Sequence, residues 1–331
     1  MKLVAAPESW AGLRDDWAAL VRQLDPPAGV FADPDFPAAW AHVFAADEQL
    51  EPYAVRDATG TLVGVLPVRF RDGVATFIGD PEICDYMDMV AAPGAGPAVA
   101  DALLALLDER GCGAAEIRGL AEGSPTLEAL PAAARRQEWT VRSAQEAVCP
   151  VVTLPARWES YLDGLKGKNR HEVRRKLRHL ADGGARVALE AEAAPQGMGD
   201  ALESLFTMMR DSRRDKAEFL DDRRAAFFRE LVRRFGPRGL ARLYFLLVDG
   251  RRVAAMLTFE TPDEVMAYNS GYDPAYRDLA VGLASKVYLI RHSIERGARR
   301  FNFLRGNEEY KMQLGGVPSP VTRLHLERGG A

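Results

Sequence analysis

The chain has 331 residues, of which 47% are hydrophobic and 27% charged, a composition typical of a soluble globular protein and a length that favours two domains. No apolar run reaches the roughly 18 residues that a membrane helix needs, and the short apolar start soon meets Glu8, so we expect neither a membrane span nor a signal peptide. Three widely spaced cysteines (Cys84, Cys112, Cys149) and five histidines without metal-motif spacing indicate a cytoplasmic protein with no metal site.

The charge is unevenly distributed. Residues 1–150 carry 11 basic and 23 acidic side chains, a net charge of −12, whereas residues 151–331 carry 32 and 24, a net charge of +8. The basic second half could contact an anionic ligand. The alternative is that the two halves only attract each other.

The first half begins with two amphipathic helices, at residues 8–24 and directly after Asp33-Pro34. Three strands joined by tight turns follow, at residues 52–56, 61–70 and 74–78. A polar segment, 79–88, then leads to a helix at 97–110, a strand at 114–118, a helix from Ser124-Pro125 and a strand at 148–154.

The second half repeats this order. Helices at 155–165, 169–180, 199–213 and 222–235 precede strands at 240–248, 251–259 and 264–272. Apolar residues at helical spacing then run from Gly282 to Gly297, and strands follow at 299–304 and 321–326. This order predicts an α/β protein with a mixed sheet and two architecturally repeated domains, 1–150 and 151–331.

The loop before the long helix, Arg277 to Gly282, has the form R-x-x-A-x-G. Such a loop exposes successive backbone N–H groups at the positive end of a helix, and the arginine adds a charge. The pattern predicts a pyrophosphate site. The alternative is an ordinary strand–helix connection.

Tyr310 and Lys311 follow the next strand, at the sheet edge where α/β proteins bind ligands. A tyrosine, with an ordinary pKa of about 10, is suited to protonate a thiolate leaving group. Lys311 is one of only seven lysines against 36 arginines, so we expect it to hold an oxyanion or a phosphate. The alternative is a surface turn with a packed tyrosine.

A basic helix occupies residues 166–180, where seven Lys or Arg side chains and two histidines surround a single Glu172. Arg170 and Arg174 lie on one helical stripe and are expected to contact an anion, which could be a nucleotide, an acidic substrate or RNA. No aromatic residues are interleaved, so base stacking is not predicted. A solvated basic face is the alternative.

In the first half, Asp85, Tyr86 and Asp88 lie in the polar segment. A carboxylate beside an aromatic ring could bind an amine or act as a base, although turn or cap roles are commoner for aspartate. We expect the neighbouring Cys84 to be structural, because nothing near it in the sequence would activate a thiol.

Together these motifs resemble the GNAT acyltransferase superfamily, and most of all its two-lobed branch of CelD/BcsL-like acetyltransferases and related Fem-type aminoacyltransferases. The resemblance rests on Tyr272-Asp-Pro-x-Tyr276, the R-x-x-A-x-G loop, Asn302-Phe-Leu-Arg-Gly306 with the following Tyr310-Lys311, and the basic helix. It implies two tandem GNAT-like lobes. Two residues depart from the family pattern: Ala280 replaces a glycine, which reduces backbone freedom, and Asn302 replaces an aspartate, which removes a charge.

The resemblance also implies roles for individual residues. The second lobe would bind acetyl-CoA or another acyl-CoA through Tyr268, Asn269, Ser270, Arg277, Ala280, Val281 and Gly282. Tyr310 corresponds to the tyrosine that protonates the leaving thiolate, and Lys311 to the Fem-type lysine near the transferred acyl group. The first lobe is acidic where a phosphate loop would be basic, so it would be degenerate and shape the acceptor side. The implied acceptor contacts are Tyr86, Asp88, Arg170, Arg174 and Tyr272, with Asp85 as candidate base.

The expected reaction is N-acyl transfer, most simply N-acetyl transfer, by direct attack of a primary amine of a small molecule or peptide. A backbone N–H of residues 268–270 would hold the oxyanion. Two alternatives stay open. The first is a Fem-type enzyme that uses aminoacyl-tRNA, and the basic helix supports it. The second is a non-catalytic duplicate that only binds CoA or a nucleotide. The sequence favours no particular oligomeric state.

Overall fold

The computed structural model describes residues 3–24, 29–193 and 196–329. The chain forms two compact units, the first made of Met1–Val148 with Ser319–Ala331 and the second of Cys149–Pro318. The C-terminal boundary differs from the expected domain 151–331. The physical reason is that the last strand, β14 (Val317–Arg328), pairs antiparallel with β7 (Ala114–Ala121) of the first unit.

The first unit has two sheets. Strands β1 (Ala5–Pro7), β2 (Tyr53–Arg56), β3 (Leu62–Leu66) and β6 (Val90–Ala91) form one, and β4 (Val68–Arg71), β5 (Val74–Phe77), β7, β14 and β8 (Trp139–Thr153) follow one another in the second. The helical elements are α1 (Trp10–Arg22), the 3₁₀ turn η1 (Gly29–Ala32), α2 (Asp35–Phe44), α3 (Gly96–Glu109) and α4 (Pro125–Arg136).

The single strand expected at 61–70 is wrong. It breaks at Pro67 into β3 and β4, which belong to different sheets. Pro67 has no N–H to give to a ladder, and its carbonyl instead accepts the N–H of Ile78 at 2.7 Å. The first unit therefore lacks the continuous three-stranded meander that the sequence predicts.

The second unit has one sheet, in which the end of β8 is followed by β13 (Arg300–Asn302), β12 (Glu264–Tyr272), β11 (Arg251–Glu260), β10 (Ala241–Val248) and β9 (Val187–Glu192). Its helices are α5 (Trp158–Gly164), α6 (Gly167–Ala181), α7 (Met198–Ser212), α8 (Arg214–Phe219), α9 (Asp222–Phe235), α10 (Val281–Glu295) and α11 (Glu309–Gln313), with 3₁₀ turns η2 (Asp182–Gly184) and η3 (Pro274–Leu279). The sequence predicts neither α8 nor β9.

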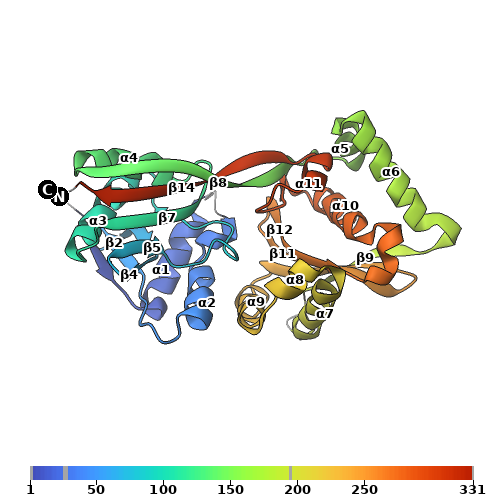
Figure 1. Cartoon of the computed structure of the whole chain (residues 1–331), viewed down its shortest axis with the longest axis horizontal. Helices are drawn as coiled ribbons and strands as arrows, with labels where there is room; N and C mark the ends of the chain where they lie inside the picture. Colours follow the sequence, from blue (N-terminus) through green and yellow to red (C-terminus); the bar gives the residue numbers. More distant parts are fainter. Residues whose placement is uncertain (1–2, 25–28, 194–195, 330–331) are drawn as a thin grey trace. The chain divides into compact units, whose positions relative to one another are not determined.

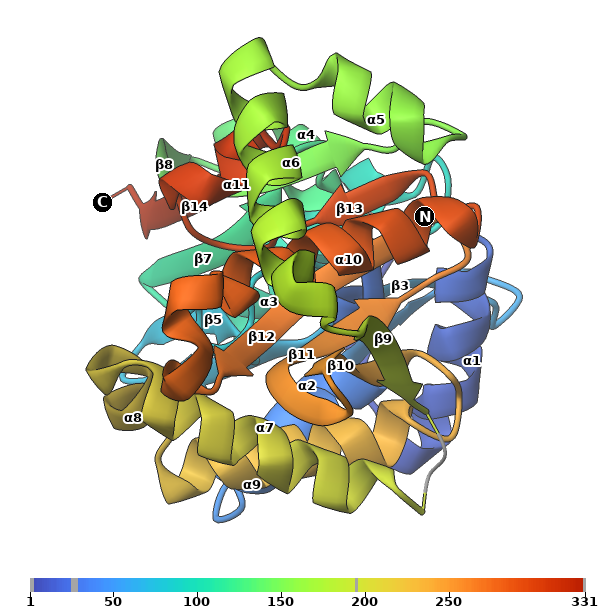
Figure 2. The same ribbon diagram turned by 90° about the vertical axis from the view of Figure 1, so that its right-hand side faces the viewer.

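Helices cover both faces of this sheet. Within the second unit, α10 contacts one face of β10, β11 and β12, with α6 packed on α10, whereas α7 and α9 lie on the opposite face (Figures 1 and 2). No helix among residues 3–24, 29–193 and 196–329 combines the length and apolar character needed to cross a membrane.

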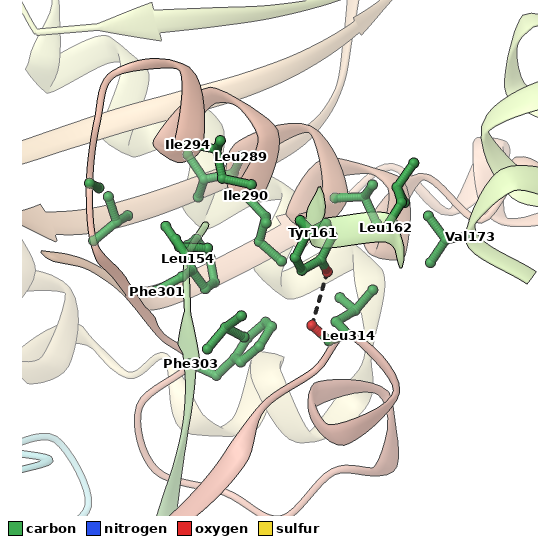
Figure 3. Packing of buried hydrophobic residues seen from close by; sticks show 14 of the residues in the cluster. Leu154, Tyr161, Leu162, Val173, Leu289, Ile290, Ile294, Phe301, Phe303 and Leu314 are labelled. Carbon is green, nitrogen blue, oxygen red and sulfur yellow. Dashed lines mark hydrogen bonds between the residues drawn. The ribbon is translucent and has the colours of Figure 1, made fainter. Parts of the chain in front are cut away.

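The core of the second unit explains why α10 forms. Val287, Ile290 and Ile294 are buried at helical spacing, and Gly297, with φ 87°, ends the helix in the left-handed region that favours glycine. They pack with aromatic residues from β13 and α5 (Figure 3). The Tyr161 hydroxyl donates to the Leu314 carbonyl at 2.9 Å, which ties α5 to the residue that ends α11.

Each unit contains the same type of strand–helix–strand connection, in agreement with the predicted mixed α/β repeat. In the first unit, β5 and β7 are parallel strands joined through α3, and in the second unit β12 and β13 are parallel strands joined through α10. A parallel pair needs such a crossover, which places a helix N-terminus just after the first strand. In the second unit that N-terminus belongs to α10.

Candidate functional site

The candidate site lies at the end of β12, beyond the part of this strand that pairs with β13. Within β12, only Glu264–Met266 pair with β13, so residues 267–272 extend beyond the parallel pairing. On the other side of β12, Leu257 faces Asn269 and Thr258 faces Ala267, which leaves Tyr268 as a bulge. A bulge re-aims the neighbouring backbone groups. The stretch 268–270, expected to hold an oxyanion, therefore combines an open edge with an irregular backbone.

The loop after β12 leads into an uncapped helix. Ala280 adopts the left-handed conformation (φ 53°, ψ 35°), and α10 starts at Val281 with no side-chain cap and no acidic residue in its first turn. The first bonds of the helix run from the N–H groups of Leu283 and Ala284 to the Ala280 carbonyl. The preceding N–H groups, of Val281 and Gly282, are thus at the positive end of a 15-residue helix, which suits an anion.

Arg277 and Tyr272 have different parts in this loop. Arg277 is exposed and makes no ion pair with any described residue. Tyr272, expected as an acceptor contact, is half-buried, and a Cβ on Gly282 would lie 3.1 Å from its ring. The ring therefore packs against the start of α10, and the absence of a side chain at Gly282 permits this close approach.

Lys286 connects the strand, the helix and α11. Its ammonium donates to the Gly282 carbonyl at 2.9 Å and to Ser270 Oγ at 3.2 Å, and it lies 5.5 Å from the centre of the Tyr310 ring. These contacts bring together the end of β12, the first turns of α10 and the predicted proton donor.

Tyr310 is half-buried, with its ring edge-on to Phe303 at 6.1 Å. Its hydroxyl makes no hydrogen bond to any described residue. Burial raises the Tyr310 pKa above its usual value, and the Glu308 charge adds to this shift. The hydroxyl therefore stays protonated at neutral pH but is a weaker acid than the unperturbed tyrosine that the sequence analysis assumed.

Lys311 is not available in the way that was expected. Its buried ammonium donates to the carbonyls of Leu304 (3.2 Å), Arg305 (2.8 Å) and Gly306 (3.5 Å) and pairs with Glu308 at 3.0 Å. An ammonium has three protons, so these partners occupy them all. In this structure Lys311 holds the segment before α11 and adds positive charge, without offering a free donor to an oxyanion.

Sequence reasoning missed Lys286 and Lys216. Lys216, on α8, donates to the Ser270 carbonyl and lies 3.4 Å from Ser270 Oγ. Burial and the charges of Lys216 and Lys311 lower the pKa of Lys286 to about 7, and burial with the Arg213 charge lowers the pKa of Lys216 to about 8. The signal was present in the sequence, because the scarcity of lysine that drew attention to Lys311 applies equally to these two.

The basic helix α6 borders the same region. Lys168, Asn169 and His171 face Leu283 of α10 and Gln313 of α11 across a cavity of about 290 Å³. The two arginines predicted to bind an anion are instead near Asp163: Arg170 at 3.5 Å and Arg174 at 4.0 Å. The cavity-lining residues of α6 are thus better placed for a ligand than the predicted stripe.

The other predicted residues belong to the first unit and are mostly buried. Tyr86 packs edge-on against Phe31 at 5.6 Å, Asp88 accepts a hydrogen bond from Thr126 Oγ1 at 2.5 Å, and Asp85 is half-buried. Burial raises the Asp88 pKa to about 7. The segment 79–88 is therefore not the open polar loop that was predicted. Cys84 is buried, as are the other two cysteines.

Comparison with known proteins relates part of the second unit to a known domain family. Residues 167–312 match the family model "Acetyltransferase (GNAT) domain". No curated protein matches the sequence. The fold is similar to that of a C-terminal domain assigned to a lysylphosphatidylglycerol synthetase of Agrobacterium fabrum (TM-score 0.62, 12% identity, 97% of this chain and 93% of that one). It is also similar to FemX (TM-score 0.59, 12% identity, 94% and 95%) and to a tandem GNAT protein from the clavulanic acid biosynthesis pathway (TM-score 0.51, 14% identity, 99% of both chains).

The matched segment contains α6, the sheet strands β9–β13 and the loop–helix unit of Arg277 to Lys311, while the structural neighbours cover both units. The predicted superfamily, the two-lobed fold and the enzyme class are confirmed on these grounds. Residues 167–312 thus form a GNAT acetyltransferase domain, and the whole chain has a two-lobed fold similar to those of the tandem GNAT protein and FemX.

Proposed function

We propose that the protein is an N-acyltransferase that moves an acyl group, most simply acetyl, from acyl-CoA to a primary amine of a small molecule or peptide. One observation carries this proposal. The turn η3, which carries the exposed and unpaired Arg277, leads from the open end of β12 to the uncapped start of α10. A diphosphate can lie on the start of α10 while the group attached to it reaches the end of β12.

In the proposed acyl transfer, the donor-binding residues and the proton donor have separate roles. Arg277 and the N–H groups of Val281 and Gly282 hold the pyrophosphate, and backbone N–H groups of residues 268–270 stabilise negative charge on the carbonyl oxygen. Acyl-CoA supplies the thioester. The neutral amine forms the C–N bond as the C–S bond breaks, and Tyr310 gives its proton to the departing sulfur. The proton that the amine nitrogen loses on becoming an amide passes through solvent and restores the Tyr310 hydroxyl.

Calorimetric titration with acetyl-CoA tests the donor site. Arg277→Glu should weaken binding by about tenfold or more, because it replaces an attractive charge beside the pyrophosphate with a repulsive one. Arg251→Glu is the matched control, since Arg251 is also exposed in the second unit and forms no ion pair with a described residue. Absence of binding at millimolar acetyl-CoA, or equal affinities of the two variants, would refute the donor site.

A second candidate is a Fem-type transferase that uses aminoacyl-tRNA. The observation in its favour is that Lys166, Lys168 and Arg178 of the α6 region are exposed and form no ion pair with any described residue. An RNA-binding protein loses affinity steeply with salt as counterions are released. Binding of tRNA with a steep salt slope, reduced in a Lys166→Glu/Lys168→Glu variant, together with no acetyl-CoA binding, would favour this candidate.

A further inference from the structure

Three of the seven lysines meet at the end of β12, although they come from different helices. Lys216 on α8 and Lys286 on α10 lie 3.4 Å and 3.2 Å from the same hydroxyl, Ser270 Oγ. Lys311 on α11 is close enough for its charge to act on both. Cations repel one another, so this arrangement has an electrostatic cost.

Only Lys311 has a carboxylate partner. Its ammonium pairs with Glu308, while Lys216 and Lys286 contact only carbonyl and hydroxyl oxygens and form no ion pair with any described residue. Asp215, next to Lys216 in sequence, is bound to Arg213 at 2.7 Å. The Glu308 carboxylate acts on both lysines, but its single negative charge faces three lysines, so the cluster keeps a net positive charge.

Lys311 shows what a purely structural buried lysine looks like in this chain, with every proton on a fixed partner. Lys216 and Lys286 differ, because neither ammonium forms an ion pair with a described residue and both point at one neutral hydroxyl. Two neighbouring cations without an ion-pair partner form a favourable position for an anion.

We propose that Lys216, Lys286 and the Ser270 hydroxyl form a subsite for an anionic group, a carboxylate or a phosphate, carried by one of the two reacting molecules close to the transferred acyl group. The subsite rests on the proposed function, because the Tyr310 ring and the first turn of α10 adjoin Lys286. The anion has two possible sources. It is the far end of a dicarboxylic acyl chain on the donor, or it is an acidic group on the acceptor amine.

Binding of an anion to the subsite should change the protonation of the two lysines. The neighbouring groups do not titrate between pH 7 and 9, because the Glu308 pKa is lowered and the Tyr310 pKa is raised. The Asp215 pKa is also lowered, by its contact with Arg213. Lys286, with a pKa of about 7, and Lys216, with a pKa of about 8, are partly neutral at pH 8. An anion raises both pKa values, so its binding takes up a proton.

The donor arm of the test compares acetyl-CoA with succinyl-CoA by calorimetry at pH 8, in two buffers of different ionisation enthalpy. If the acyl chain is the source, succinyl-CoA binds about tenfold more tightly and takes up part of a proton. Lys216→Met and Lys286→Met each abolish both effects and leave acetyl-CoA affinity within about twofold. Arg251→Met, which removes an exposed charge elsewhere in the unit, changes neither effect.

The acceptor arm uses acetyl-CoA and pairs of amines that differ by one carboxylate, namely amino acids and their decarboxylated counterparts. If the acceptor is the source, the acid of a pair has a kcat/KM about tenfold higher, and both lysine variants remove that advantage. Circular dichroism and the unfolding midpoint confirm that the variants are folded.

The proposal is overturned if neither arm shows a preference that depends on the two lysines. It is also overturned if Lys286→Met weakens acetyl-CoA and succinyl-CoA equally, because Lys286 would then bind a part that both share. If acetyl-CoA binds and its affinity depends on Arg277, but neither succinyl-CoA nor the acidic amines are preferred, then the subsite is refuted and the proposed function is not. If acetyl-CoA does not bind at all, the proposed function is refuted.

Discussion

The segments that follow β5 and β12 occupy the same place in the two units and have opposite characters. In the first unit, most side chains between Ile83 and Met89 are buried, including Tyr86 and Asp88. In the second unit, the side chains of Pro274, Ala275, Arg277 and Asp278 are exposed and lead into the uncapped start of α10.

The difference shows how a repeated plan can keep one donor site. Both units place a helix between two parallel strands, so the topology alone would allow a phosphate at either helix. In the first unit that helix, α3, is preceded by the short strand β6 and by a buried segment with an acidic side chain, which does not suit an anion. Activity should therefore depend on the second unit, and the first unit should respond to change mainly in its stability.

The largest effect is expected for Tyr310→Phe, which would place the chemistry in the second unit. Loss of a general acid lowers rates by about 10² to 10⁴-fold, so kcat should fall by this order while acetyl-CoA affinity stays within about threefold. Steady-state kinetics with the best amine acceptor, and calorimetry with acetyl-CoA, measure the two quantities.

Tyr288→Phe is the matched control for Tyr310→Phe. Tyr288 is a half-buried tyrosine on α10 whose hydroxyl forms no hydrogen bond with a described residue. It should retain normal kcat. An unchanged kcat in Tyr310→Phe would remove the proton-donor role, and normal CoA binding without transfer to any amine of a broad panel would favour the non-catalytic alternative.

The sequence predicts elements with local patterns and misses what only tertiary structure decides. The predicted bounds 222–235 and 264–272 match α9 and β12, since each has a clear hydrophobic period and a clear end. The division of 61–70 between two sheets depends on strand partners far away in the chain. Likewise, Lys216 and Lys286 are 70 positions apart in the sequence, and only the fold brings them to Ser270.

A smaller effect, on the pH dependence of stability, is expected from the buried carboxyl group of Asp88 in the first unit. The Asp88 Oδ2 atom is buried without a hydrogen-bond partner among the described residues, and burial raises the Asp88 pKa to about 7. The folded state therefore holds the proton more tightly than the unfolded state, whose pKa is about 4. Stability is unaffected below pH 4, falls as pH rises from 4 to 7, and above pH 7 is lower by up to about 4 kcal/mol.

Asp88→Asn cannot ionise, so it should remove this loss and be more stable than the natural protein at pH 8 but not at pH 4. Urea unfolding at pH 4, 5, 6, 7 and 8 gives the difference curve. The exposed Asp47→Asn, in the same unit, should show no such curve. A difference that does not change with pH would show that Asp88 is ionised in the folded state.

The smallest effect tests the one departure from the family pattern that lies in the donor loop. Ala280 takes the left-handed conformation although it is not glycine, at a cost of about 1 kcal/mol. Ala280→Gly should relieve this strain and, after the extra entropy of glycine in the unfolded chain, raise the free energy of unfolding by about 0.5 kcal/mol. Ala275→Gly, in the same loop at negative φ, should lower it by about as much.

Equal acetyl-CoA affinities of Ala280→Gly and the natural protein would show that the fold already sets the loop in its binding conformation. A tighter-binding Ala280→Gly would instead mean that alanine restricts the loop, so that this site differs from its relatives in affinity as well as in sequence.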